Sequence, residues 1–116
     1  MRILVVDKCV RVRSALKLLT EHATDHSIVG EVEDAEKLMA TISETTPDLV
    51  LLEWEILQEL KSGVIASLKA ENPGLKVVIL SRQPSYRKSA MEAGADHFMC
   101  KIDPPDRLQE ILRGYS

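Results

Sequence analysis

Cysteine, glycine and proline are all scarce in this chain of 116 residues, and each scarcity excludes a class of protein. The two cysteines, Cys9 and Cys100, are too few for a disulfide-stabilised scaffold and lack the paired spacing of a zinc site. Five glycines and five prolines exclude a collagen-like or low-complexity chain. Because 45% of the residues are hydrophobic, we expect residues 1–116 to fold as one independent domain.

Long apolar runs and an excess of charge of one sign are missing as well. Ile3–Val6 and Leu49–Leu52 are among the longest apolar runs, and both fall far short of the roughly twenty residues of a membrane span. Asp7 interrupts the first run too early for a signal peptide. A net charge of −3 gives no bulk affinity for nucleic acid or anionic membranes. We therefore expect a cytoplasmic protein without membrane attachment.

Continuous apolar runs alternate along the chain with segments of helical periodicity. The apolar runs are typical of strands covered on both faces, and they lie at 2–7, 27–31, 48–53, 75–81 and 95–101. Helices are predicted after each run, at about 8–22, 35–46, 64–71, 84–94 and from 103 onward with Asp103 as N-cap. The segment 54–63 has no glycine or proline before its end, so we expect helix there too.

Five strand–helix units predict an α/β fold. Right-handed crossovers between parallel strands place helices on both faces of one sheet. The expected fold is a flavodoxin-like (βα)5 doubly wound five-stranded parallel sheet with strand order 2-1-3-4-5. Ligands of such sheets bind beyond the carboxyl ends of the strands where the order reverses, between the first and third strands. Asp7 and Glu53 end those two strands.

Four polar residues end strands at this edge of the predicted sheet: Asp7, Glu53, Ser81 and Lys101. A hydroxyl and an ammonium can bind phosphate oxygens, while carboxylates can bind a metal or act as a nucleophile. The pattern therefore fits a phosphoryl site. Strand ends are also polar in any sheet of this class because the chain reaches the surface there, so the spacing alone leaves both interpretations open.

The chain from Arg2 to about Tyr115 resembles the receiver domain of bacterial two-component response regulators. The resemblance rests on four segments: Ile-Leu-Val-Val-Asp at 3–7, Pro-Asp-Leu-Val-Leu-Leu-Glu-Trp at 47–54, Val-Val-Ile-Leu-Ser at 77–81, and Ala-Gly-Ala-Asp-His-Phe-Met-Cys-Lys at 93–101. In that family an acidic pair after the first strand holds Mg²⁺ and an Asp ending the third strand accepts phosphate from a histidine kinase. A Thr or Ser and a Lys bind the phosphoryl group.

Carried over residue by residue, the resemblance assigns Asp7 to the metal pocket, Ser81 and Lys101 to phosphate binding, and Phe98 to the aromatic switch position. The other two positions depart from the family. Lys8 stands where the second acid is expected, and Glu53 stands where the phosphoacceptor Asp is expected.

The two departures change the expected chemistry. At about 4 Å and an effective dielectric constant near 20, each unit-charge contact is worth on the order of 4 kcal/mol, so exchanging an acid for Lys8 should abolish Mg²⁺ binding. The additional methylene of Glu53 displaces its carboxylate, and misplacement by about 1 Å can slow an oriented reaction by roughly 10². We expect no metal and no cofactor. We also expect the Lys8 ammonium to pair with Glu53 or Asp7. In an alternative arrangement, Glu53 reaches Ser81 and Lys101 as a phosphate would and holds an active-like state.

The leading functional hypothesis is a receiver-like signalling domain that is not an enzyme, works without phosphorylation and acts in transcription regulation through protein contacts. The resemblance implies that a protein partner or a second copy binds the fourth helix, fifth strand and fifth helix, although a solvated helix face explains the pattern equally well. The basic and aromatic residues of that face are Arg82, Tyr86, Arg87, Lys88 and Arg107.

Two alternatives remain. One is a phosphoaccepting receiver of low efficiency in a DNA-binding transcriptional regulator, whose DNA-binding domain lies outside this chain. The other is a flavodoxin-like enzyme or flavin carrier, which the residues after Asp7 disfavour because they form no Gly/Ser/Thr-rich phosphate cradle. We further expect Trp54 to be partly buried, and both Cys100 and Cys9 to be buried apolar residues.

Overall fold

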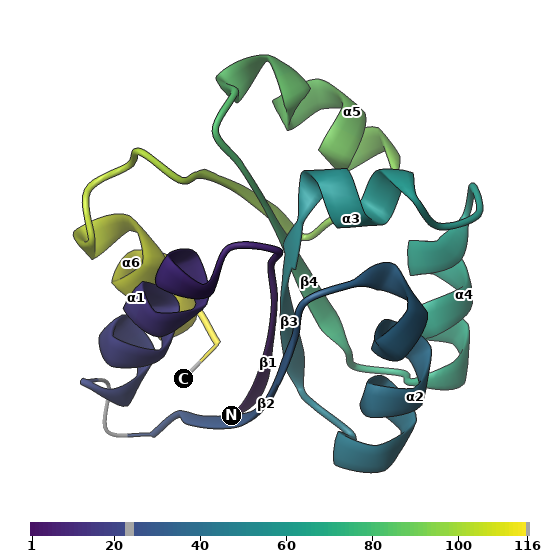
Figure 1. Cartoon of the computed structure of the whole chain (residues 1–116), viewed down its shortest axis with the longest axis horizontal. Coiled ribbons are helices and arrows are strands. Elements are labelled where there is room, and N and C mark those ends of the chain that lie inside the picture. The colour runs from purple at the N-terminus through teal and green to yellow at the C-terminus, as the bar shows by residue number, and fades with distance from the viewer. Residues whose placement is uncertain (23–24, 116) are drawn as a thin grey trace.

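The computed structural model describes residues 1–22 and 25–115 and contains one five-stranded parallel sheet (Figure 1). The strand order is β2-β1-β3-β4-β5, which confirms the predicted doubly wound topology. The strands are β1 (Arg2–Val6), β2 (Ser27–Val32), β3 (Leu49–Glu53), β4 (Lys76–Ser81) and β5 (His97–Cys100).

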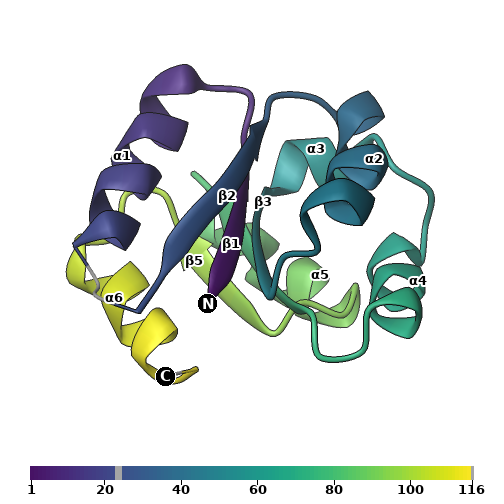
Figure 2. The same ribbon diagram turned by 90° about the horizontal axis from the view of Figure 1, so that it is seen from below.

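Helices cover both faces of the sheet, as Figure 2 shows: α1 and α6 lie on one side, and α2, α3, α4 and α5 lie on the other. The predicted additional helix after β3 is present as α3. None of the helices among the described residues is long and apolar enough to cross a membrane. The bounds are α1 (Val10–Glu21), α2 (Ala35–Thr45), α3 (Trp54–Gln58), α4 (Val64–Glu71), the 3₁₀ turn η1 (Pro84–Tyr86), α5 (Arg87–Glu92) and α6 (Asp106–Arg113).

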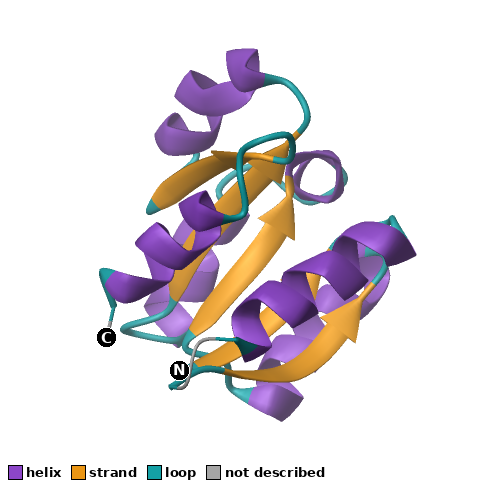
Figure 3. Cartoon of the chain, turned by 90° about the vertical axis from the view of Figure 1, so that its left-hand side faces the viewer, coloured by secondary structure: helices purple, strands orange, loops and turns teal. Residues whose placement is uncertain are grey.

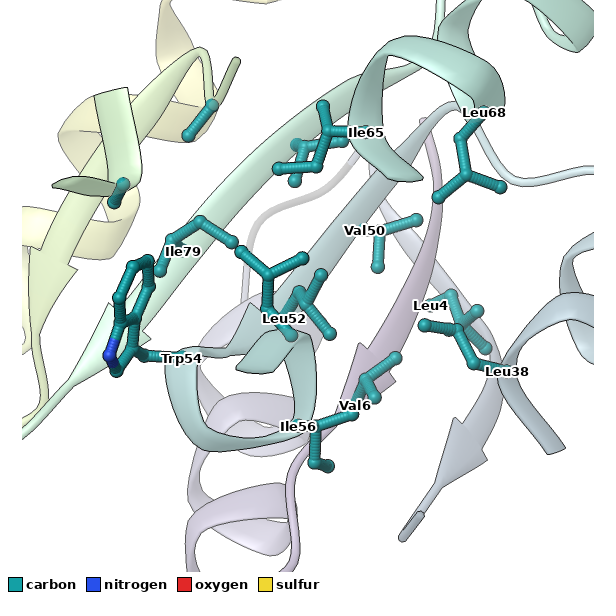
Figure 4. Packing of buried hydrophobic residues seen from close by; sticks show 14 of the residues in the cluster. Leu4, Val6, Leu38, Val50, Leu52, Trp54, Ile56, Ile65, Leu68 and Ile79 are labelled. Carbon is teal, nitrogen blue, oxygen red and sulfur yellow. The ribbon is translucent and has the colours of Figure 1, made fainter. Parts of the chain in front are cut away.

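The sheet separates two hydrophobic clusters because successive strand residues point to opposite faces. Leu4 and Val6 of β1 pack toward α2 and α3 with Leu52 of β3 (Figure 4), whereas Ile3 and Val5 pack toward α1 and α6. Burial on both faces explains why the strands are continuously apolar in sequence. It also leaves the ends of the strands as the place where polar side chains can gather.

The predicted cap of the last helix is wrong. Pro105, not Asp103, is the N-cap of α6, which begins at Asp106. The two consecutive prolines carry no N–H that Asp103 could cap, and its carboxylate instead accepts a hydrogen bond from the backbone N–H of Cys100 at 3.0 Å. Asp103 therefore fixes the turn that follows β5, immediately beside Lys101.

Candidate functional site

Three ionisable side chains from separate strands meet at the carboxyl edge of the sheet. Asp7 follows β1, Glu53 ends β3 and Lys101 follows β5. The Lys101 ammonium lies 2.7 Å from Asp7 Oδ2 and 2.6 Å from Glu53 Oε2. Because β4 separates β3 from β5 in the sheet, Lys101 spans the end of β4 to reach both acids.

The three side chains are withdrawn from solvent. Asp7 is fully buried, and the side chains of Glu53 and Lys101 are each 8% exposed. Backbone N–H groups supply the remaining partners: Asp7 Oδ1 accepts from Cys9 N at 2.9 Å, and Glu53 Oε1 accepts from Lys8 N at 3.2 Å. Each carboxylate is thus held between the one ammonium and one backbone donor.

Two acids share one buried cation, and their pKa values move in opposite directions. Burial raises the pKa of Asp7 above its ordinary value, and the contacts with Lys101 and the Cys9 N–H only partly oppose this shift. Burial acts the same way on Glu53, but hydrogen bonds from Lys101 and the Lys8 N–H outweigh it and hold the pKa of that carboxyl below its ordinary value. Burial also opposes the charge on Lys101, whereas its two acidic partners raise the pKa of the ammonium. Burial therefore decides the direction of the shift at Asp7, and the hydrogen bonds decide it at Glu53.

The predicted pairing of the Lys8 ammonium with Asp7 or Glu53 is wrong. Lys8 Nζ lies 3.4 Å from Glu59 Oε2 at the end of α3, and both side chains are 51% exposed. Only the backbone N–H of Lys8 contacts Glu53. Lys101 already occupies the position between the carboxylates, and a second buried ammonium would add its own desolvation cost there.

Ser81 and Phe98 both point inward. Ser81 is fully buried, and its hydroxyl accepts a hydrogen bond from Gln83 N at 3.1 Å. In the alternative arrangement predicted from the sequence, Glu53 contacts both Ser81 and Lys101 as a phosphate would. Among the described residues, Glu53 accepts a hydrogen bond from Lys101 but makes none to Ser81, so only one of the two contacts is present. The Phe98 ring is buried, and the Arg87 guanidinium lies 5.1 Å from its centroid.

Trp54 and Tyr86 form a contact that sequence reasoning missed. Their rings are stacked with centroids 5.2 Å apart, and Trp54 is more buried than expected at 8% exposure. The stack connects the first residue of α3 to η1. No signal in the sequence pairs these two residues, because the contact depends on how far α3 winds after β3.

The two cysteines differ. Cys100 is buried as predicted, and its thiol lies 3.4 Å from the Arg82 carbonyl oxygen. The prediction for Cys9 is wrong, because this residue is only half-buried at the N-terminal end of α1. Hydrogen bonds from the backbone N–H groups of Val12 and Arg11 lower the pKa of its thiol.

Comparisons with known proteins agree with this architecture. Residues 3–113 match the response regulator receiver domain. The chain belongs to that family. Receiver domains are signalling domains, so the chain is a signalling domain of this family.

Two of the relatives are named as regulators of transcription. The chain is 23% identical to the transcriptional regulatory protein CitT of Bacillus subtilis, with 98% of the chain and 51% of CitT aligned. It is 30% identical to a protein named as a transcriptional regulator in Pseudomonas aeruginosa, with 98% of the chain and 58% of that protein aligned. The chain therefore spans about half the length of the curated relatives it matches.

Solved structures share the fold. The signal receiver domain of the NarL regulator from Mycobacterium tuberculosis superposes with a TM-score of 0.83 at 20% identity, covering 98% of this chain and 94% of that chain. The isolated receiver domain of RcsB from Salmonella enterica serovar Typhimurium, solved with phosphomimetic BeF₃⁻, gives 0.85 at 17% identity, covering 99% and 87%.

Proposed function

We propose that this receiver domain is atypical and signals through protein contacts without being phosphorylated. The observation that carries the proposal is the Lys101 ammonium held between Asp7 and Glu53 at 2.7 Å and 2.6 Å. The contact neutralises part of the negative charge that would bind a metal cation, and it engages the Glu53 oxygen Oε2 that would otherwise be free to attack a phosphoryl donor. The Glu53 carboxylate is also buried and held by Lys101 and the Lys8 N–H, so it is not oriented toward an incoming phosphoryl donor.

The donor set does not suit Mg²⁺, the ion that the family implies. Mg²⁺ requires near-octahedral oxygen ligands at about 2.0–2.1 Å, usually one or two carboxylates with several waters. Here the oxygens of Asp7 and Glu53 face Lys101 and backbone N–H groups, and Lys8 contributes no oxygen from its side chain. Within residues 1–22 and 25–115, no group of three His, Cys, Asp or Glu side chains could hold a metal. We propose that the domain uses neither Mg²⁺ nor another cofactor.

The partner surface that we propose is the basic and aromatic face formed by η1, α5, β5 and α6. Arg82 and Lys88 are exposed on it and make no ion pair within the described chain, whereas Arg107 lies 3.7 Å from Glu110. Two unpaired cations favour an acidic protein surface as the partner. Because the relatives are named as transcriptional regulators and are about twice as long, we further propose a cytoplasmic regulator with a DNA-binding domain outside this chain.

A second candidate is a phosphoaccepting receiver of low efficiency. It is supported by Ser81 and Lys101, which match the phosphate-binding positions of the family and lie at the same edge of the sheet as Glu53. In this case Glu53 would have to leave Lys101 before it could attack a phosphoryl donor.

One experiment separates the two candidates. The chain is incubated with acetyl phosphate and Mg²⁺, and intact mass spectrometry monitors a gain of about 80 Da per phosphoryl group. The unphosphorylated mass should persist for the natural chain. The Lys8→Asp/Glu53→Asp variant, which supplies an acid at both positions where the chain departs from the family, should gain the adduct.

The matched control is Lys8→Asp/Glu53→Asn, which has the same acid at position 8 and no acceptor carboxylate at position 53. It should gain no adduct, so that any mass increase of the Asp variant is assigned to position 53. A stoichiometric adduct on the natural chain would overturn the phosphorylation-independent function. It would favour the second candidate if the Glu53→Gln variant lost it.

A further inference from the structure

A cavity opens between α1 and α6, on the side of the sheet opposite to α3 and α5. It encloses about 240 Å³, and its apolar walls include Val12 and Leu19 of α1, Leu80 of β4, Met99 of β5 and Leu108 of α6. Figure 3 views the molecule from the side of these two helices and shows them in front of the sheet. Leu80, Met99 and Leu108 are buried members of the hydrophobic cluster on this side, so a molecule in the cavity would contact the core of the domain.

The volume of the cavity suits a small molecule. Protein interiors are close-packed and contain few spaces larger than a water molecule. An apolar cavity of about 150 Å³ can bind benzene. The cavity of about 240 Å³ therefore has room for one ring with a short side chain. Walls that are mostly apolar favour a hydrocarbon body, and a few polar groups then fix its orientation and its specificity.

One acid in the wall has a carboxylate oxygen without a partner. Asp103 is half-buried, and its Oδ2 accepts the hydrogen bond from Cys100 N at 3.0 Å. Within residues 1–22 and 25–115, Asp103 makes no ion pair and no second side-chain hydrogen bond.

The charge of Asp103 is not compensated within the cavity. Lys101 also lines the cavity, but its ammonium is held by Asp7 and Glu53 at 2.7 Å and 2.6 Å. The walls contain no other charged residue. A carboxylate with a free oxygen binds an ammonium group by a charge-assisted hydrogen bond, which is stronger than a bond to a neutral donor. The charge of the wall therefore favours a cationic ligand and disfavours an anionic one.

We propose that this cavity is a binding site for a small amine with an aromatic body. The ring lies against the buried leucines, and the ammonium donates to the free oxygen of Asp103. Because Asp103 fixes the turn that follows β5, the bound amine would stabilise that turn beside Lys101. The site goes beyond the proposed function, and it is expected whether or not Glu53 accepts a phosphoryl group.

The test titrates the full chain, labelled with ¹⁵N, with 2-phenylethylamine and records the backbone amide signals by nuclear magnetic resonance. Saturable shifts with a dissociation constant of roughly millimolar or tighter are expected, centred on wall residues such as Leu80, Cys100 and Asp103. Phenylacetate has the same ring and the opposite charge, and it should bind at least about tenfold more weakly. No saturable shift with the amine, or equal binding of the two probes, would overturn the proposal.

A charge variant tests the role of Asp103. Asp103→Asn keeps an oxygen for the Cys100 N–H and removes the charge, so it should weaken the binding of 2-phenylethylamine by about tenfold. The matched control is Asp106→Asn, which removes the same charge from an exposed residue outside the walls and should leave the binding unchanged. Equal weakening by the two variants would contradict the direct contact with Asp103.

A larger side chain tests the location of the site. Ala15 of α1 lines the cavity and is exposed, so Ala15→Trp should fill the space and abolish the binding of 2-phenylethylamine. Ala70→Trp is the control, because it makes the same change at an exposed position of α4 outside the walls and should leave the binding intact. Circular dichroism verifies that both variants fold. Unchanged binding by folded Ala15→Trp would overturn the proposal and would leave the outcome of the phosphorylation experiment unaffected.

Discussion

Two lysine–carboxylate clusters lie at opposite ends of the sheet, and they differ in burial and in the balance of charge. At the carboxyl edge Lys101 contacts Glu53 at 2.6 Å and a second acid, Asp7. At the amino edge Lys69 contacts a single acid, Asp96, also at 2.6 Å, with side-chain exposures of 30% and 23%. The contact distances are the same, so the difference between the clusters comes from their surroundings.

The pKa values reflect that difference. Burial opposes the charge of Asp96, but hydrogen bonds from Lys69 and the Val77 N–H outweigh it and lower the pKa of the carboxyl. Burial dominates at Asp7 and raises its pKa, because Lys101 is shared with Glu53. A one-to-one pair is typical of a structural ion pair, whereas an excess of buried carboxylate is typical of a site that evolved around something other than stability. Five predictions test this contrast and the cost of burial behind it, in order of expected size.

Removing the shared lysine should have the largest effect. Lys101→Met leaves two buried carboxylates without their cation, so the free energy of unfolding should fall by about 3–5 kcal/mol at pH 7. Lys69→Met is the matched control, and its loss should be about 1 kcal/mol or less because the pair is partly exposed. Urea unfolding followed by circular dichroism measures both. Equal losses for the two variants would contradict the contrast.

Neutralising the acids should have effects of opposite sign. Asp7→Asn removes the excess buried charge, and at pH 7 it should raise the free energy of unfolding by on the order of 1 kcal/mol. Asp96→Asn removes a paired charge and should lower it by a similar amount.

The pH dependence of the two acids follows from the direction of each pKa shift. The native pKa of Asp7 lies above its ordinary value of 3.8, so its favourable contribution is complete at low pH and is lost as the pH rises through the native pKa. The pKa of Asp96 is lowered, so its contribution is present above the unfolded-state pKa and is lost as the pH falls through the native value. Unfolding curves at pH 4 and pH 7 should therefore show the gain of Asp7→Asn shrinking at pH 4. A gain that grows at pH 4 would show that the sign is wrong.

A buried polar group without charge tests whether burial alone is costly. Thr20 on α1 is fully buried, and its hydroxyl has no hydrogen-bond partner among the described residues. Thr20→Val should increase the free energy of unfolding by about 1 kcal/mol, since the methyl group needs no partner. Thr45→Val is the control, because the Thr45 hydroxyl donates to the Thr41 carbonyl oxygen at 2.7 Å. A gain in both variants would assign the effect to the greater hydrophobicity of valine rather than to the missing partner.

The smallest effect is expected at the exposed pair. Lys8→Ala breaks the contact with Glu59, in which both side chains are 51% exposed, and should change stability by no more than about 0.5 kcal/mol. Thermal unfolding at low and high salt measures it. A loss comparable to that of Lys101→Met would mean that Lys8 enters the buried cluster in solution.

The strands and the topology were predictable because each apolar run is buried on both faces and each helix presents one apolar side. The unusual helix after β3 was predictable as well, since Trp54–Gly63 lacks a glycine or proline until its end. The start of α6 was not, because the cap preference of Asp103 is overridden by the two prolines that follow it. Local sequence patterns therefore predict which helices and strands form. The start of α6 differs from the prediction because the two prolines override the capping preference of the aspartate before them.

The sequence also predicts which residues make up the site, but it does not predict which of their charged side chains form ion pairs. The carboxyl ends of parallel strands share one edge, so the sequence determines that Asp7, Glu53, Ser81 and Lys101 gather there. Which cation meets the acids was decided by the tertiary structure, where Lys101 reaches Glu53 across 48 residues of sequence while Lys8 turns to Glu59. The reason is that strand order and burial are set by hydrophobic periodicity, whereas an ion pair depends on which flexible side chain reaches a desolvated carboxylate at the lowest cost.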